Sequence, residues 1–408
     1  MKTKDGKYRI QKSKLIFISL ILLTTAIACK KENPEFTGCG EGSGVTDVHL
    51  MEKTYKENMI FKAGSDGYHT YRIPSIIKTN SGTLIAFCEG RKNNSEDYGD
   101  IDLVAKRSTD NGMTWSSLIV IWDDGNSTCG NPTPVVDYNT GTIWLFMSWN
   151  SGVKNQNGNN GFSKIDTYGD RRLFSITSTD DGITWTDLTD RTLDLTPVTY
   201  TWDAVGPGNG IQLTQGPYKG RLMIPACGRT IYSDDHGTSW QYKLINEGTC
   251  EGCIVELCDE TLMRNDRSAG LYRDQKSRLV SISKDFGITW SPWEIQSKLP
   301  DPICQASIIR YDESYPTRLV FINPNTSGPL RINMTVQISY DNGNTWPVKR
   351  LLQSWIGGYS CLCKTQDNNI ASLQEYGGLD AHLGTTVSIV YRGFNLSWII
   401  NGKPEPVL

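Results

Sequence analysis

Short runs of alternating apolar and polar residues recur along most of the chain, and few segments have the spacing of an amphipathic helix. The runs Ile101–Ala105, Arg172–Thr177 and Arg278–Ile282 have the pattern of strands, and each leads into a polar turn that contains glycine. The 408 residues include 39 Gly, 12 Trp and 18 Tyr, which suits strands joined by tight turns. The pattern predicts an all-β protein built from many short strands.

One eight-residue pattern, Ser-x-Asp-x-Gly-x-Thr/Ser-Trp, occurs five times after such runs. The copies are Ser108–Trp115, Ser178–Trp185, Ser233–Trp240, Ser283–Trp290 and Ser339–Trp346. Successive copies begin at intervals of roughly 50 to 70 residues, so the chain repeats one structural unit.

Each position of this pattern has a local physical role. The Asp carboxylate can accept hydrogen bonds from turn amides, and Gly supplies the positive φ that a tight hairpin needs. The Trp carries a large apolar face into the layer between neighbouring sheets. A repeated strand–turn–strand unit of roughly fifty residues is typical of one blade of a β-propeller.

Charge and cysteine usage narrow the choice of function. The 41 Lys and Arg nearly balance the 44 Asp and Glu, and the net charge of −3 gives no reason to expect a nucleic acid partner. The 38% hydrophobic and 21% charged residues exclude a disordered, charged tail protein. The four His and the Cys residues lack metal-ligand spacing, so we expect no zinc site and no cofactor. Buried thiols are the expected state of the ten Cys that follow the first one.

The N-terminal segment resembles the signal peptide of a bacterial lipoprotein. Basic residues in Met1–Lys14 precede the apolar run Leu15–Ala28, which is shorter than a typical transmembrane helix. Cys29 follows small residues, at the position where such proteins are cleaved and lipidated. Ala26 departs from the Leu that is usual in this motif, so ordinary secretion with Cys29 as a bystander is the alternative.

These observations divide the chain into three parts. Residues 1–29 form the expected lipoprotein signal peptide, residues 30–50 a tether, and residues 51–408 a β-propeller domain. The expected location is the bacterial cell envelope, on the periplasmic side or the cell surface, with the lipid anchor as the only membrane contact. We expect a monomer.

The five repeats resemble the Asp-box, or BNR repeat, and beside Tyr71-Arg72-Ile73-Pro74 they resemble the bacterial exo-α-sialidase (neuraminidase) family. The resemblance covers roughly residues 60–400 and implies a glycoside hydrolase on a six-bladed β-propeller. One blade would lack the box, and a C-terminal strand around Val387–Ile399 would close the ring. The boxes themselves are expected to be structural.

The substrate of this family is a sugar acid, whose carboxylate calls for fixed, bidentate positive charge. The resemblance implies three arginines for that carboxylate, Arg72, Arg267 and Arg331. Arg264 lies three positions from Arg267 and is its weaker rival, and Arg91 is an additional candidate in the cleft.

The anomeric carbon of sialic acid already bears a carboxylate, so a carboxylate nucleophile would be repelled and a neutral Tyr hydroxyl is better suited. Tyr359 matches the family's nucleophile, and Glu251, which precedes Arg267 at the family's spacing, matches the residue that takes its proton. Glu256 is the nearby rival of Glu251, with a structural role expected. Glu375, whose distance along the chain from Tyr359 fixes the match, corresponds to the acid that orients the first arginine.

The leaving-group oxygen needs a proton donor, which the family places on a loop after the first arginine strand. Position along this loop favours Asp97, with Asp100 and Glu96 as alternatives. The resemblance implies a retaining mechanism through a tyrosyl–sialosyl intermediate.

Three functions remain open at this point. The first is hydrolysis of terminal α-linked sialic acid from glycoproteins, gangliosides or oligosaccharides. A propeller that binds such glycans without cleaving them is the second, although it would not need the Tyr359–Glu251 pair. A trans-sialidase is the third, because cleft walls and water access are not encoded in the motifs.

Overall fold

Four-stranded antiparallel sheets dominate the computed structural model, which describes residues 51–312, 317–377, 386–403 and 405. Within this part of the chain, four such sheets are separate blades. The first has the order β1 (Tyr55–Phe61), β26 (Val387–Phe394), β25 (Ile370–Gly377), β24 (Ser360–Lys364). The second has the order β12 (Ile211–Gln212), β13 (Leu222–Ala226), β14 (Arg229–Ser233), β15 (Gln241–Leu244). The third consists of β16 (Thr249–Glu256), β17 (Leu262–Ser268), β18 (Ser277–Ser283), β19 (Glu294–Pro300), and the fourth of β20 (Ser307–Arg310), β21 (Leu319–Pro324), β22 (Met334–Ser339), β23 (Val348–Gln353).

The prediction of six separate blades requires a correction, because the remaining strands form one eight-stranded sheet. Its first set is β2 (Thr70–Lys78), β3 (Leu84–Arg91), β4 (Ile101–Ser108) and β5 (Ile119–Trp122). Its second set is β6 (Thr128–Val136), β7 (Ile143–Asn150), β10 (Arg171–Ser178) and β11 (Thr189–Asp190). The sets join because β4 and β6 run parallel and pair at Ile101 and Thr128, a contact between elements that the local repeat pattern does not encode.

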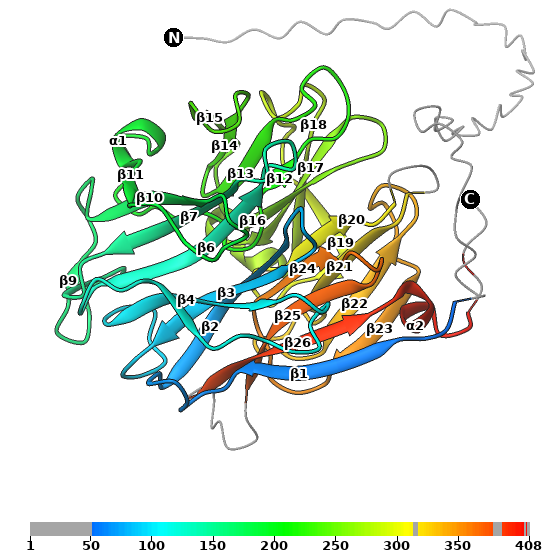
Figure 1. Cartoon of the computed structure of the whole chain (residues 1–408). Coiled ribbons are helices and arrows are strands. Elements are labelled where there is room, and N and C mark those ends of the chain that lie inside the picture. The colour runs from blue at the N-terminus through cyan, green and yellow to red at the C-terminus, as the bar shows by residue number, and fades with distance from the viewer. Residues whose placement is uncertain (1–50, 313–316, 378–385, 404, 406–408) are drawn as a thin grey trace, which may run out of the picture. The chain divides into compact units, whose positions relative to one another are not determined.

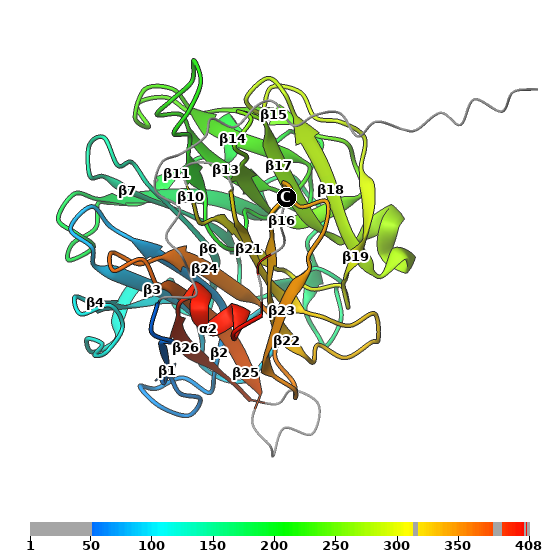
Figure 2. The same ribbon diagram turned by 90° about the vertical axis from the view of Figure 1, so that its right-hand side faces the viewer.

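The first and last strands of the described chain lie side by side, with β1 in blue next to β26 in red (Figure 1). The strand expected around Val387–Ile399 ends earlier, at Phe394, and is followed by the short helix α2 (Leu396–Ile400). Asn395 begins this helix because its side chain accepts a hydrogen bond from the Trp398 amide at 2.9 Å. Figure 2 shows α2 on the side turned toward the viewer.

The sheets pack around a common centre, where β2 contacts both β6 and β24, and β20 contacts both β16 and β24. Asn209 ties this centre together, because its amide donates to the carbonyl oxygens of Ile76 at 2.5 Å and Leu362 at 3.1 Å. The remaining elements are short: β8 (Lys154–Asn155), β9 (Ser163–Lys164), α1 (Thr192–Leu195) and the 3₁₀ helix η2 (Gly270–Gln275). Among the described residues, no helix has the length and apolar character needed to cross a membrane.

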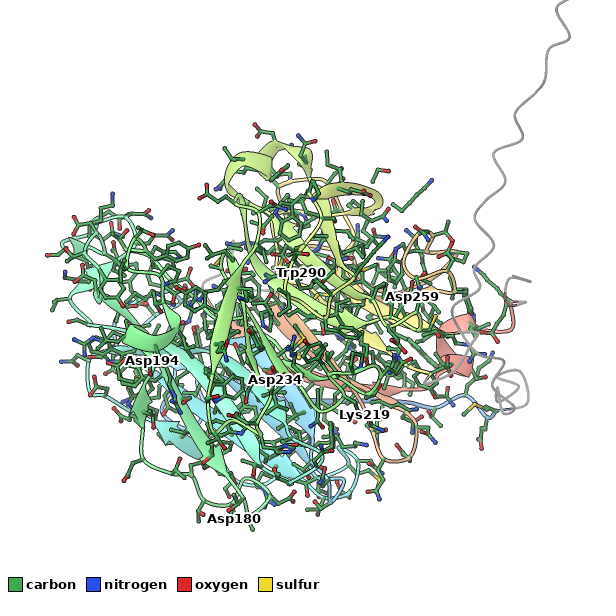
Figure 3. The ribbon with its side chains drawn as sticks, turned by 90° about the horizontal axis from the view of Figure 1, so that it is seen from above. Asp180, Asp194, Lys219, Asp234, Asp259 and Trp290 are labelled. Carbon is green, nitrogen blue, oxygen red and sulfur yellow. A yellow bond between two sulfur atoms is a disulfide. The ribbon has the colours of Figure 1, made fainter. Side chains whose placement is uncertain are left out.

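All five repeats form the same turn. In the first copy, Ser108 donates to the Asp110 carboxylate at 2.8 Å, and the amide and hydroxyl of Thr114 donate to it at 2.9 and 2.6 Å. Gly112 has a φ of 83°, as the turn requires. The repeated Trp packs across the gap between sheets, as in Trp115 against Tyr391 with ring centroids 5.3 Å apart. Figure 3 labels Asp180 of the second copy and Trp290 of the fourth.

Of the three parts predicted for the chain, the structure describes the domain over residues 51–408, apart from residues 313–316, 378–385, 404 and 406–408. The described residues belong to one compact unit, Gly38–Leu408. The signal peptide over residues 1–29, with Cys29, and the tether over residues 30–50 lie outside the described residues and stay predictions.

Candidate active site

A cavity of about 690 Å³ gathers side chains from several sheets and from the loops between them. Seven of the predicted site residues line it: Arg72, Arg91, Asp97, Glu251, Arg267, Arg331 and Tyr359. Glu375 lies directly behind Arg72, with 2% of its side chain exposed. Residues that are far apart in the sequence are therefore brought into one cleft.

Arg72 points into the cleft because β2 is interrupted after it. The pairing of β2 with β3 shifts between Arg72 and Ser75, and Ile73 in this bulge has a φ of 59°. The Glu375 carboxylate accepts from Arg72 Nε at 3.1 Å and from the Ile73 amide at 3.0 Å. One buried carboxylate thus fixes both the backbone and the guanidinium of the bulge.

Glu375 also positions Tyr359, since its Oε2 accepts a hydrogen bond from the Tyr359 amide at 3.0 Å. Gly358 is required beside it, because a Cβ at that position would lie 1.9 Å from Glu375 Oε2. Tyr359 is 6% exposed and packs against Ile73 and Cys304. The phenol is therefore held by its backbone and by an apolar wall.

Three guanidinium groups surround this phenol. Arg267 Nη1 donates to the Tyr359 hydroxyl at 3.2 Å, and the guanidinium carbons of Arg72 and Arg331 lie 5.5 and 5.1 Å from the ring centroid. Arg331 Nη2 is anchored on the carbonyl oxygen of Ile303 at 3.0 Å. The three predicted arginines converge on one point of the cleft, where a carboxylate can bind.

Glu251 reaches the same point through a second bulge. It is the extra residue between Cys250 and Gly252 in the pairing of β16 with β17, and its φ is 58°. Its Oε2 lies 2.8 Å from the same Arg267 Nη1 that donates to Tyr359. Burial and the nearby charge of Glu251 raise the pKa of Tyr359 well above its ordinary value, against the opposing effect of Arg267 and Arg331. The phenol is neutral in this form.

Asp97 lies at the mouth of the cleft with 74% of its side chain exposed. Its Oδ1 is 2.9 Å from Arg72 Nη1 and 2.8 Å from Arg91 Nη2. Partial loss of water at the cleft mouth favours the neutral acid, but Arg91 and Arg72 outweigh this effect and hold the pKa of Asp97 well below its usual range. In this form Asp97 is ionised and forms an ion pair with Arg72, one of the arginines predicted to bind the substrate carboxylate.

The alternatives to Asp97 occupy other surroundings. Asp100 is 17% exposed and lies 3.2 Å from Lys92 Nζ, which also pairs with Asp102. Glu96 lines the cleft and is exposed, and its amide donates to the Asn94 side chain at 2.9 Å. Of the three acids, Asp97 is the one for which ion pairs with both Arg72 and Arg91 are observed.

The rivals of two other site residues have structural surroundings. Arg264 is fully buried and pairs with Asp266 at 2.8 Å, between two sheets. Glu256 accepts hydrogen bonds from the Thr214 and Gln215 amides and lines a different cavity. Neither Arg264 nor Glu256 lines the cleft, whereas Arg267 and Glu251 do.

Arg91 lines the cleft but directs its donors toward the protein. Its Nε and Nη2 lie 3.1 and 2.7 Å from Glu89 Oε2, and its Nη1 donates to the Ser95 carbonyl oxygen at 2.6 Å. With its pairing to Asp97, this arginine organises the acid loop.

The expectation of buried thiols is wrong for at least one pair, since Cys227 and Cys250 form a disulfide with a Cα separation of 4.6 Å. The bond links the turn after β13 to the strand that carries Glu251, and both cysteines line the cleft. A pairing between two sheets has no local sequence signal. The free, buried thiols of the described part are Cys88, Cys129, Cys253, Cys304, Cys361 and Cys363.

One wall of the cleft was missed by sequence reasoning. The guanidinium carbon of Arg171 lies 4.4 Å from the ring centroid of Trp202. Tyr200 also lines this part of the cleft. Asn155, Asn157 and Asn159 come from the segment between β7 and β10. These residues lie outside the repeated pattern, and an isolated Trp near polar turns was the one signal available.

Comparison with known proteins places the chain in a class. The family model described as a BNR repeat-like domain matches residues 82–370, in agreement with the repeated turns and the propeller architecture. The exo-alpha-sialidase of Arthroderma benhamiae is 41% identical over 372 residues, which cover 83% of this chain and 86% of that protein. The chain belongs to the sialidase family and is a glycoside hydrolase.

Solved structures agree with this fold. The Hadza microbial sialidase Hz136 has a TM-score of 0.71 at 27% identity and is matched over 84% of this chain and 69% of its own. The intramolecular trans-sialidase of Ruminococcus gnavus has a TM-score of 0.71 at 20% identity, over 86% of this chain and 99% of its own, and supports the fold alone.

Proposed function

We propose that this protein is an exo-α-sialidase that hydrolyses terminal α-linked sialic acid from glycoproteins, gangliosides or oligosaccharides, with retention of configuration. The observation that carries the proposal is the convergence of Arg72, Arg267 and Arg331 on the Tyr359 phenol. A cluster of three guanidinium groups suits a sugar acid, and a neutral phenol beside it suits attack on a carbon that bears a carboxylate.

The substrate carboxylate binds among the three arginines. Arg72 is aimed by Glu375, and Arg331 is aimed by the Ile303 carbonyl oxygen, so little rearrangement is needed when the carboxylate arrives. This placement sets the anomeric carbon next to Tyr359 Oη.

Tyr359 attacks the anomeric carbon as its proton passes to Glu251. Arg267 Nη1 lies between the two oxygens and keeps them in register. Because burial raises the pKa of Tyr359, the phenol reacts only when this acceptor takes the proton during the attack.

Asp97 supplies the proton that the leaving group needs. In this form it is paired with Arg72, and the incoming substrate carboxylate competes for the same guanidinium. Once the sugar acid holds Arg72, Asp97 loses one cationic partner and gains a negative neighbour, so its pKa rises and its protonated form becomes available.

The cycle then closes in two steps. The anomeric carbon–oxygen bond breaks as Asp97 protonates the aglycone oxygen and the Tyr359 Oη–carbon bond forms. Water next attacks the tyrosyl–sialosyl intermediate, giving a proton to Asp97 while Tyr359 regains its own from Glu251.

Incubation with 3′- and 6′-sialyllactose, followed by mass spectrometry of the products, tests the activity. Free sialic acid is the expected product, and NMR during early turnover should show its α anomer first. Anhydro or re-linked sialic acid would instead assign a trans-sialidase, and binding without any release would leave a glycan-binding propeller.

We propose that the two four-stranded sets of the eight-stranded sheet act as two blades, so that six blades surround the cleft; their single-pair junction supports this. We further propose that Cys29 carries a lipid that anchors the enzyme in the cell envelope, with the tether over residues 30–50. Loss of metabolic palmitate labelling in Cys29→Ala would test the anchor.

A further inference from the structure

The loop that carries Asp97 is in contact with a second loop from the neighbouring set of strands. Tyr98, next to Asp97, packs its ring against Phe162 edge-on, with centroids 4.6 Å apart. Asn160 Nδ2 donates a hydrogen bond to the Tyr98 hydroxyl at 2.8 Å. Phe162 and Asn160 belong to the segment between β7 and β10.

This second loop is internally braced. The buried Asn155 side chain accepts from the Gly158 amide at 2.6 Å and donates to the Asn159 carbonyl oxygen at 3.1 Å. Lys154 in β8 pairs with Ser163 in β9, directly after Phe162. The braced loop therefore presents Phe162 and Asn160 as a fixed surface.

The acid loop is closed at its base by other contacts. The Lys92 amide donates to the Asp100 carbonyl oxygen at 3.1 Å, and the Thr128 hydroxyl donates to the Gly99 carbonyl oxygen at 3.0 Å. Arg91 holds the Ser95 carbonyl oxygen on the other side. These contacts fix the ends of the loop, whereas the Tyr98 contact fixes the residue next to the acid.

The contact matters most when substrate is bound. The sugar carboxylate competes for Arg72, so the acid then depends more on the remaining restraints of its loop. A displacement of about 1 Å can reduce the rate of an enzyme on the order of 10²-fold. A restraint one residue from the acid is well placed to prevent it.

We propose that Tyr98, Phe162 and Asn160 are positioning residues that hold the Asp97 carboxyl group over the glycosidic oxygen of bound substrate. This inference rests on the proposed function, in which Asp97 is the proton donor. Tyr98 faces the exposed cleft mouth, and its ring and hydroxyl act on the loop rather than on the reacting atoms.

The test compares two leaving groups. Sialyllactose loses a sugar alkoxide and needs the proton of Asp97, whereas a 4-nitrophenyl sialoside loses a stable phenolate and needs it little. Phe162→Ala should lower kcat about tenfold or more on sialyllactose and less than about twofold on the aryl sialoside, with KM nearly unchanged. Tyr98→Phe keeps the ring and loses the Asn160 hydrogen bond, so it should retain most of the activity that Tyr98→Ala loses.

Two reference variants complete the design. Asp97→Ala should show the same dependence on the leaving group with a larger loss, since kcat on sialyllactose should fall on the order of 10²-fold or more. Tyr218→Ala removes a comparable aromatic contact, with Phe286 at 5.4 Å, away from the cleft and should affect neither substrate.

The outcomes separate the two claims. Suppose that the loss of kcat in Asp97→Ala depends on the leaving group, but Phe162→Ala lowers kcat equally on both substrates or on neither. The positioning role is then overturned and the proposed function stands. If Asp97→Ala lowers kcat equally on both substrates, the proposed proton donor is wrong and the inference fails with it. Should Phe162→Ala not fold, Tyr98→Ala against Tyr98→Phe gives the same comparison on both substrates, because the first removes the ring contact with Phe162 and the second removes only the hydrogen bond from Asn160.

Discussion

The repeated turns and the cleft use the same residue types in opposite ways. Every partner of Asp110 in the first turn lies within four residues of it, and the other copies repeat this arrangement. In the cleft, Arg72 is held by Glu375, which is 303 residues away. Local partners make a turn that any blade can carry, whereas distant partners make a site that exists only once the sheets have assembled.

Their carboxylates show what this difference means for chemistry. The pKa of Asp110 falls to about 2 chiefly because the neutral Thr114 hydroxyl and amide donate to it. Partial loss of water raises the pKa of Asp97, but the cations Arg91 and Arg72 outweigh this effect and lower it. A bound sugar acid can neutralise or displace cations but leaves a local turn unchanged, so only the cleft carboxylate can respond to substrate.

The largest expected effect comes from a substitution that removes the chemistry of the cleft and leaves the repeated turns unchanged. Tyr359→Phe removes the nucleophilic oxygen and should lower kcat on the order of 10³-fold or more, without a change in melting temperature. Steady-state kinetics with sialyllactose measure the effect, and Tyr242→Phe on β15, which does not line the cleft, is the matched control. Wild-type turnover in a folded Tyr359→Phe would refute the nucleophile.

A smaller loss should follow removal of one carboxylate-binding arginine. Arg331→Met loses a charge-assisted contact to the sugar acid, so KM should rise roughly 10- to 100-fold while kcat changes little. Arg107→Met, which breaks an ion pair with Asp181 outside the cleft, should leave KM unchanged. A fall in kcat at constant KM would instead give Arg331 a role in the transition state.

The response of Asp97 to substrate predicts a difference between two pH profiles. The profile of kcat/KM reports the free enzyme, in which arginines lower the pKa of Asp97, and that of kcat reports the complex, in which the substrate carboxylate raises it. The basic limb that depends on Asp97 should therefore lie about one pH unit or more higher in kcat than in kcat/KM. Asp97→Asn should abolish this limb, and coincident limbs in the native enzyme would contradict the exchange on Arg72.

The smallest effect concerns the turns. Asp110→Ala should lower the free energy of unfolding by about 1 kcal/mol, since neighbouring backbone and side-chain donors lose their acceptor at a partly exposed site. Because the folded pKa of Asp110 is depressed, its contribution is present above the unfolded pKa and is lost as pH falls toward about 2. Denaturant unfolding at pH 7 and pH 3 measures both, and kcat should not change.

What could be predicted from the sequence follows the same division between local and distant contacts. The turns, the strands before them and the all-β class were predictable because their causes lie within one short repeat. The site residues were found through a family resemblance and fixed spacings, such as the interval from Tyr359 to Glu375, which lie on the adjacent strands β24 and β25 or next to them.

What was missed depends on contacts between elements. The disulfide of Cys227 with Cys250, the wall of Trp202 and Arg171, and the junction of Ile101 with Thr128 all join segments from different strands or sheets. No local pattern encodes such pairings. The pairing of Asp97 with Arg72 was missed for the same reason, although both residues had been singled out.

Covalent trapping tests the central claim most directly, namely that guanidinium groups from separate sheets present a sugar acid to the Tyr359 phenol. The enzyme would be treated with 2,3-difluorosialic acid, a sialoside whose transferred sugar hydrolyses slowly, then digested and mapped by mass spectrometry. The account predicts one sialosyl adduct, on the peptide that contains Tyr359, and none in Tyr359→Phe. An adduct on another residue, or turnover of sialyllactose with no adduct at all, would contradict it.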